Sequence, residues 1–190
     1  MKFVTYLDGK KERVGVINDD ETWVYPLRSL GMPYSDMQEV IEKMSKAEKE
    51  LIGIYNRKDP DEIHGAVPVK DVGLLAPIPR PKQDIICLGI NYMEHAAESA
   101  RYKKEAFGGE RPYAVYFSKR VNEAVQNKGF IEAHENLVDS LDYECELAVI
   151  IGKDAKNVSE DDAAEYIFGY TIINDVSARN VQTRHKQWYF

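Results

Sequence analysis

The chain has 190 residues and a formal net charge of −7, with 44% hydrophobic and 30% charged residues. This composition is typical of a soluble globular protein, and the length suits one good core or a small domain followed by part of a larger one. The acidic balance argues against nucleic-acid and membrane partners, because phosphate backbones and acidic lipids repel such a surface. No apolar run approaches the roughly 20 residues that span a bilayer.

The N-terminus "MKFVTYLDGKK" goes directly into strand-like sequence, which predicts no signal or transit peptide. Cys87 and Cys145 both lie inside apolar runs, a placement that favours reduced core thiols over a disulfide framework. We therefore expect a cytoplasmic protein.

The first 73 residues are expected to form a small α+β domain. Short apolar runs separated by turn-forming residues predict strands, and Ser followed three residues later by Gln or Glu predicts a helix start. In chain order, we expect a strand meander over 2–26 with turns at Asp8-Gly9 and Asn18-Asp19, helices capped by Ser35 and Ser45, and a short strand within 66–75.

Prolines at positions 77, 79 and 81 interrupt regular structure, so we predict domains at residues 1–73 and 74–190. An extended surface linker is the alternative interpretation of this proline cluster. Beyond it we expect strands at 84–90, 111–119, 140–152 and 170–174, helices at 91–107 and 159–169, and a polar, partly helical segment at 175–190.

The stretch "LDYECELAVIIG", residues 141–152, carries acids at alternate positions of a predicted strand. Since strand side chains alternate between faces, Glu144 and Glu146 point the same way, about 7 Å apart. Asp142 can share their face, with Tyr143, Cys145 and Leu147 packed on the other. Ionised carboxylates at the edge of a core are costly unless they pair with a cation or a metal ion.

A third carboxylate, Asp175, follows the predicted strand "YTIIN". Carboxylates without a His or Cys partner favour a hard ion such as Mg²⁺, Mn²⁺ or Ca²⁺ over zinc. Two other interpretations stay open at this point: a solvated acidic edge strand, and Asp175 as a helix N-cap.

His95 and Glu98 are three residues apart on a predicted helix and share one face. A carboxylate beside a histidine makes a suitable general base, although helical surfaces often carry such pairs without function.

Arg179 and Gln182 follow Asp175 by four and seven residues, so in a helix all three share a face. They can offer a carboxylate clamp and an amide to a ligand, and an exposed Asp–Arg helical pair is the alternative. Lys119 and Arg120 are either contacts for an anionic substrate or ordinary strand-end charges.

Taken together, these blocks resemble the fumarylacetoacetate hydrolase family. The resemblance covers Leu74 to Phe190 and rests on "LLAPIPRP", "GINYMEH" with Glu98 after it, "LDYECELAVIIG" and "GYTIINDVSARNVQ". It implies an α+β protein in which a small N-terminal α+β domain precedes a β-rich catalytic domain of mixed β-roll or barrel type. The family's active-site lysine lies in a Gly-Lys-Ser block beyond Phe190, so we expect this catalytic domain to be incomplete at the C-terminus.

The resemblance also implies roles for individual residues. It makes Mg²⁺ or Mn²⁺ the expected cofactor, with Ca²⁺ as an alternative, and it leaves Asp142 without a role. The implied metal ligands are Glu144, Glu146 and Asp175, the acid/base pair is His95 and Glu98, and the substrate-binding residues are Arg179 and Gln182.

The implied substrate is a small anionic 2-oxo or 1,3-dicarbonyl acid that reacts through a metal-stabilised enolate, and the implied assembly is a homodimer. Of the reactions in the family, we favour C–C bond hydrolysis. The alternatives are isomerisation of the 2-hydroxyhepta-2,4-diene-1,7-dioate type and decarboxylation of the oxaloacetate type. A non-catalytic metal-binding module and a plain α+β domain with acidic surface strands also stay open.

Overall fold

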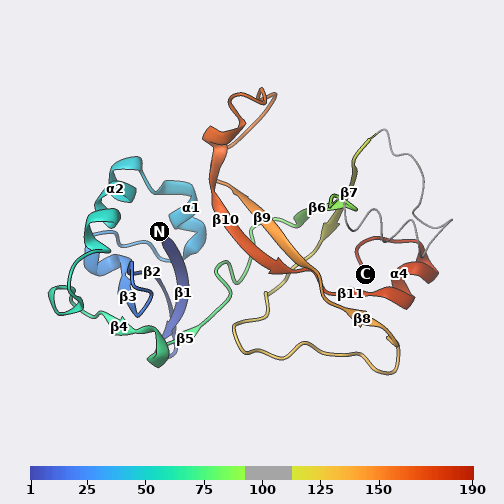
Figure 1. The fold of residues 1–190 in the computed structure, drawn as a ribbon, viewed down its shortest axis with the longest axis horizontal. Coiled ribbons are helices and arrows are strands. Elements are labelled where there is room, and N and C mark those ends of the chain that lie inside the picture. The colour runs from blue at the N-terminus through green and yellow to red at the C-terminus, as the bar shows by residue number, and fades with distance from the viewer. Residues whose placement is uncertain (93–112) are drawn as a thin grey trace. The chain divides into compact units, whose positions relative to one another are not determined.

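A computed structural model of the chain describes residues 1–92 and 113–190 (Figure 1). His95, Glu98 and most of the helix predicted over 91–107 lie outside the described residues. The chain forms two compact units. The first unit comprises 1–82, 122–131 and 150–169, and the second comprises 83–121, 132–149 and 170–190. Within the described residues, no helix has the length and apolarity needed to cross a membrane.

The first unit is built on a five-stranded antiparallel sheet in the order β4-β3-β2-β1-β5. Its predicted meander is confirmed. Gly9 adopts a positive φ of 62° in the tight turn between the first two strands, a conformation that glycine reaches without strain. The strands are β1 (Lys2–Asp8), β2 (Lys11–Ile17), β3 (Trp23–Pro26), β4 (Val67–Pro68) and β5 (Gly73–Leu74).

Two helices of this unit lie between β3 and β4 in the sequence: α1 (Met37–Lys43) and α2 (Lys46–Tyr55). Ser45 caps α2 in a complete capping box with Glu48, as predicted. Ser35 does not cap α1. The cap is Asp36, whose carboxylate accepts a hydrogen bond from the Glu39 N–H at 2.8 Å. An aspartate is as good a cap as a serine, so the helix begins one residue later.

The hydrophobic core of the first unit is formed by residues of β2 and β3 and of the segment between β3 and β4, which includes α1 and α2. Val16, Tyr25 and Leu27 are fully buried there. The remaining buried apolar residues of the cluster are Val14, Leu30, Met32, Met37, Val40, Ile41, Ile52 and Ile63. Short 3₁₀ helices connect the strands and helices, at Leu27–Leu30, Pro60–Glu62 and Val69–Asp71.

The proline-rich stretch belongs to the first unit. The Thr5 hydroxyl donates a hydrogen bond to the Pro77 carbonyl at 2.7 Å, and Arg80 forms ion pairs with Glu12 and Glu123. These contacts hold the stretch against its own unit. A domain boundary at residues 73 and 74 stays a prediction.

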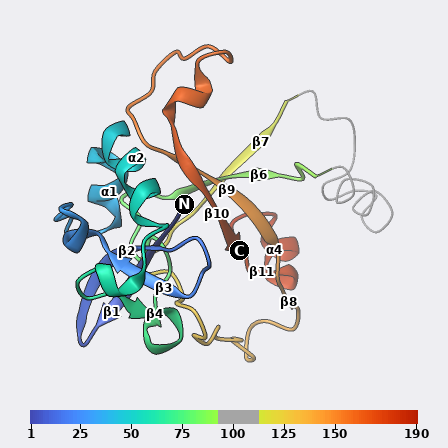
Figure 2. The same ribbon diagram turned by 60° about the vertical axis from the view of Figure 1, so that its left-hand side comes forward.

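Short antiparallel strand pairs make up the second unit. The first pair is β6 (Ile85–Gly89) with β7 (Val115–Lys119), and β8 (Leu141–Asp142) pairs with β11 (Ser177–Ala178). The longer strands β9 (Cys145–Ile151) and β10 (Ile167–Asn174) lie side by side (Figure 2) and extend into the first unit's residue ranges. The last element is helix α4 (Arg179–His185).

Two predictions about these elements need correction. The strand predicted over 140–152 is interrupted at residues 143–144, which separate β8 from β9. The helix predicted over 159–169 is wrong: a turn and the 3₁₀ helix Ala163–Tyr166 lead into β10. The residues Tyr166, Ile167 and Phe168 favour strands, and the Tyr166 carbonyl accepts a hydrogen bond from the Gly152 N–H at 2.8 Å. Pairing with β9 therefore overrides the helix-like start signal.

Candidate functional site

The interruption between β8 and β9 brings Asp175 against the acidic segment. The Asp175 N–H donates to the Glu144 carbonyl at 2.9 Å, and the Glu144 N–H donates to the Asn174 side chain at 3.2 Å. One step further along, Ser177 is the strand partner of Asp142. The backbone of Asp175 therefore lies beside the acidic segment, while its role as a metal ligand stays a prediction.

The alternation of faces survives the interruption. Asp142, Glu144 and Glu146 are all half-buried. The opposite face is not packed, contrary to prediction: Tyr143 is 79% exposed and Leu147 is 61% exposed. Cys145, predicted to be a core thiol, is exposed as well. On the covered face, Asp142 and Glu144 both meet the guanidinium of Arg179.

Arg179, the first residue of α4, is the centre of this charge cluster. Its Nε and Nη2 donate to one carboxylate oxygen of Asp142 at 3.0 and 2.8 Å, and Nη2 also pairs with Glu144. Nη1 donates to the Gln182 side-chain oxygen at 3.2 Å. Burial lowers the pKa of the guanidinium, but hydrogen bonds from it to Asp142 and Glu144 outweigh this effect and raise the pKa.

A second ion pair joins Lys119, at the end of β7, to Asp175 at 2.7 Å. Both side chains are largely buried, at 17% and 8% exposure. Asp175 is therefore not a helix N-cap, since the residue before α4 is Ala178 and makes no side-chain cap. Nor does it form an exposed pair with Arg179, which binds Asp142 and Glu144 instead. Lys119 is part of the site and not an ordinary strand-end charge.

The carboxylates of the cluster also affect the pKa of the Cys87 thiol on β6. Burial raises the pKa of its thiol to about 11, and the carboxylates of Asp175, Glu146 and Glu144 add to the rise while Lys119 opposes it. The thiol is therefore protonated at neutral pH and is not a nucleophile.

Trp188 contacts the charge cluster through Gln182. The Gln182 amide donates to the Trp188 carbonyl at 3.0 Å, and the Trp188 ring stacks on Phe117 with ring centroids 6.1 Å apart. A Cβ at Gly89 would meet the Trp188 ring at 3.2 Å, so a larger residue there would require the ring to shift by a few tenths of an ångström. Sequence reasoning missed these contacts, although "QWYF" contained the signal of an aromatic cluster.

Tyr92 links the start of the "NYMEH" block to the acidic strand. Its hydroxyl accepts a hydrogen bond from the Leu147 N–H at 3.4 Å, next to Glu146 in sequence. Tyr92 is the last described residue before His95. The block that carries the predicted acid/base pair therefore begins beside the predicted metal ligands.

Residues 84–190 match the family model of the fumarylacetoacetate (FAA) hydrolase C-terminal domain. The chain belongs to this family. It is 35% identical to the oxaloacetate tautomerase YisK of Bacillus subtilis over 199 aligned positions, which cover 100% of this chain and 64% of that protein. It is 36% identical to a fumarylacetoacetate hydrolase domain-containing protein 2 homolog of Dictyostelium discoideum, covering 99% of this chain and 59% of the relative.

Solved structures of the family agree with the fold. A fumarylacetoacetate hydrolase from psychrophilic Exiguobacterium antarcticum superposes with a TM-score of 0.70 at 31% identity, covering 100% of this chain and 60% of that one. A 5-carboxymethyl-2-hydroxymuconate delta-isomerase from Mycobacterium smegmatis gives a TM-score of 0.62 at 26% identity, covering 99% and 60%. The chain thus spans about three fifths of the length of these relatives, and its mixed α+β architecture is that of the family.

The family's site chemistry raises the question of whether these residues fit a metal ion. Within 1–92 and 113–190, no three His, Cys, Asp or Glu side chains are grouped so as to hold one. The donor set itself, which consists of the carboxylates Glu144, Glu146 and Asp175, suits a hard divalent cation. Arg179 and Lys119 now neutralise two of these acids. The residues match such an ion in donor type, whereas their arrangement in this structure is that of ion pairs with Lys119 and Arg179.

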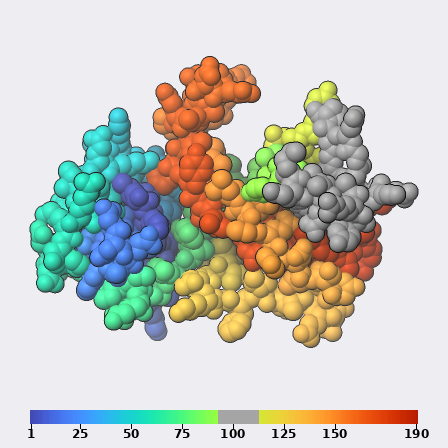
Figure 3. Space-filling view, in the orientation of Figure 1, coloured from blue at the N-terminus to red at the C-terminus, as the bar shows by residue number. Residues whose placement is uncertain are grey.

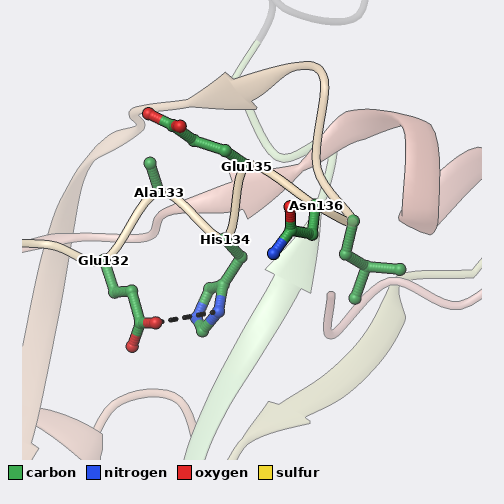
Figure 4. Close-up of a pocket in the computed structure, with 6 residues that line it drawn as sticks. Glu132, Ala133, His134, Glu135 and Asn136 are labelled. Atoms are coloured by element: carbon green, nitrogen blue, oxygen red, sulfur yellow. Dashed lines mark ion pairs between the residues drawn. The ribbon is translucent and has the colours of Figure 1, made fainter.

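A separate hollow of about 430 Å³ lies on the second unit and is lined by residues 132–137 (Figure 4). His134 and Glu132 face each other there, with their nearest nitrogen and oxygen 3.6 Å apart. The residues that line the hollow are all exposed and belong to one loop at the surface of the protein (Figure 3). The hollow is therefore open to solvent. It contains none of the predicted site residues, so the charge cluster around Arg179 is the candidate site.

Proposed function

We propose that this protein is a divalent-metal-dependent enzyme that interconverts the keto and enol forms of a small 2-oxo dicarboxylic acid of the oxaloacetate class. The observation that carries the proposal is the hydrogen-bonded contact between residues 140–144 and 174–179, which assembles carboxylates, Arg179 and Gln182 in one cluster. Its reaction class follows the tautomerase YisK, which is similar over the whole chain.

Glu144, Glu146 and Asp175 are the residues that would hold Mg²⁺ or Mn²⁺, with Ca²⁺ as an alternative. When bound, such an ion polarises a carbonyl oxygen as a Lewis acid. Arg179 and Gln182 would bind a substrate carboxylate, because a guanidinium and an amide together match its two oxygens. The net charge of −7 does not by itself exclude an anionic substrate here, since Lys119 and Arg179 place two positive charges within the site.

The reaction moves one proton: it leaves the carbon next to the carbonyl, and a proton is added to the carbonyl oxygen. His95, with Glu98 beside it, is proposed as the base, on the strength of the family resemblance. Tyr92 supports this role because its contact to Leu147 starts that block beside the acidic strand. A homodimeric assembly, also implied by the family, is part of the proposal.

Hydrolysis of a C–C bond in an acylpyruvate-type acid is the second candidate. The similarity to a fumarylacetoacetate hydrolase from Exiguobacterium antarcticum supports it. Both reactions begin with the same polarised carbonyl, and they differ in whether the base removes a proton from carbon or from water. Substrate preference therefore separates them.

The test is a turnover assay of the full-length protein with Mn²⁺ or Mg²⁺, using oxaloacetate enol–keto conversion, oxaloacetate decarboxylation and acetylpyruvate cleavage. Glu144→Gln is expected to lower metal-dependent turnover on the order of 10²-fold or more, as for removal of preorganised electrostatic stabilisation. Glu135→Gln, an exposed glutamate of the surface loop, is the matched control and should keep wild-type activity. If the protein binds the ion but turns over none of these substrates, the proposal of an enzyme would be wrong and a metal-binding module would be favoured.

A further inference from the structure

Asp142 has no role among the proposed metal ligands, yet it makes the most extensive contact with Arg179. Nε and Nη2 both donate to its Oδ2, whereas Glu144 receives a bond from Nη2 alone. With the bond from Nη1 to Gln182, these contacts use four of the five guanidinium N–H groups within the described part of the chain. One N–H on Nη1 is left for a further acceptor such as a ligand carboxylate.

The backbone fixes Asp142 relative to Arg179. Ser177, the strand partner of Asp142, lies two residues before Arg179, and the Arg179 N–H donates to the Ser140 carbonyl at 2.8 Å. The two side chains therefore leave paired segments at neighbouring positions. Such a contact between paired segments requires little additional ordering of the two side chains.

Glu144 cannot serve Arg179 and a metal ion equally well. Its side chain is 20% exposed, and the guanidinium already claims one of its oxygens. A buried guanidinium without a carboxylate partner is unfavourable, so Arg179 releases Glu144 readily only when a second carboxylate keeps it paired. Asp142, at 46% exposure, supplies that second carboxylate.

We propose that Asp142 is a positioning residue that holds Arg179 in the substrate-binding orientation and thereby frees Glu144 for the metal ion. This inference rests on the proposed function, because it assumes that Glu144 is a ligand and that Arg179 binds substrate. It assigns a role to the one acid of the strand that the proposed chemistry leaves unused.

The first test measures Mn²⁺ affinity by titration calorimetry on the full-length protein without substrate. Asp142→Asn keeps the side-chain shape and is expected to weaken Mn²⁺ binding about 10-fold, in the range of other residues that orient metal ligands. Asp139→Asn removes the same charge from an exposed position of the adjoining loop and should change the affinity less than about 2-fold. Thermal melting of each variant checks that it is folded.

A double-mutant cycle separates positioning from simple charge. If Asp142 acts through Arg179, then Asp142→Asn should have an effect below about 2-fold in an Arg179→Gln background. An equal 10-fold loss in both backgrounds would overturn the proposal, because Asp142 would then act on the ion directly.

The second test measures steady-state kinetics with oxaloacetate. Asp142→Asn is expected to raise KM about 10-fold with a smaller change in kcat, the signature of lost substrate binding, and Asp142→Glu should restore part of it. An unchanged KM together with unchanged Mn²⁺ affinity would overturn the inference while an active wild-type enzyme upholds the proposed function. A wild-type protein with neither ion binding nor turnover would overturn both.

Discussion

The two units of this chain bury different kinds of side chain. The first unit buries a cluster of apolar residues around its sheet, among them Val16, Tyr25 and Leu27. Among the described residues of the second unit, Val181 is the buried apolar side chain, while Asp175, Ser177 and Gln182 are buried polar residues. The first unit is thus stabilised by the removal of apolar surface from water, and the second depends on pairing of its charges.

The largest effect is expected where a charge pair of the second unit is broken. Asp175→Asn leaves Lys119 buried without its carboxylate, which costs about 3–5 kcal/mol for buried pairs of this kind. Replacing both partners, with Lys119→Met and Asp175→Leu, should cost less than either single change. Urea unfolding measures the free energies. A single Asp175→Asn variant with wild-type stability would mean that water already compensates this pair.

A somewhat smaller effect is expected from the apolar core of the first unit. Leu27 is fully buried, so Leu27→Ala should lower the free energy of unfolding by about 2–5 kcal/mol. The matched control is Ile54→Ala, because Ile54 is 63% exposed and its truncation should cost no more than about 0.5 kcal/mol. Thermal melting checks both. Similar melting temperatures for the two variants would contradict the apolar core as the source of the first unit's stability.

The smallest effect concerns the helix caps of the first unit. Ser45→Ala removes the acceptor of the α2 capping box and should cost about 1 kcal/mol. Asp36→Ala should cost a similar amount at the start of α1, whereas Ser35→Ala should cost clearly less because Asp36 accepts the cap hydrogen bond. Chemical denaturation of the three variants ranks them. A cost for Ser35→Ala above that of Asp36→Ala would restore the cap predicted from the sequence.

The sequence was most informative where local chemistry decides the structure. The β1–β2 hairpin and the Ser45 cap depend on neighbouring residues, and both were predictable. The helix predicted over 159–169 failed because pairing of β10 with β9 is a contact between distant residues. Local signals at Ser159 and Gly169 contain no information about that partner.

The same difference between local and long-range contacts applies to the candidate site. The alternation of acids revealed that Asp142, Glu144 and Glu146 share a face, since the strand period is a local property. Which cation each acid meets was not predictable, because Lys119 and Arg179 approach from other elements. The contact between Arg179 and Asp142 joins residues 37 apart in the sequence.

The two-residue interruption between β8 and β9 limits how this protein can vary. Residues 140–144 are held at both ends, by the Ser140–Arg179 and Glu144–Asp175 backbone hydrogen bonds. Tyr143 between them is exposed and should accept many side chains. An inserted residue, in contrast, would turn Asp142 or Glu144 to the other face, because strand side chains alternate. Substitutions at Tyr143 should therefore be tolerated, whereas insertions and deletions in residues 140–144 should not.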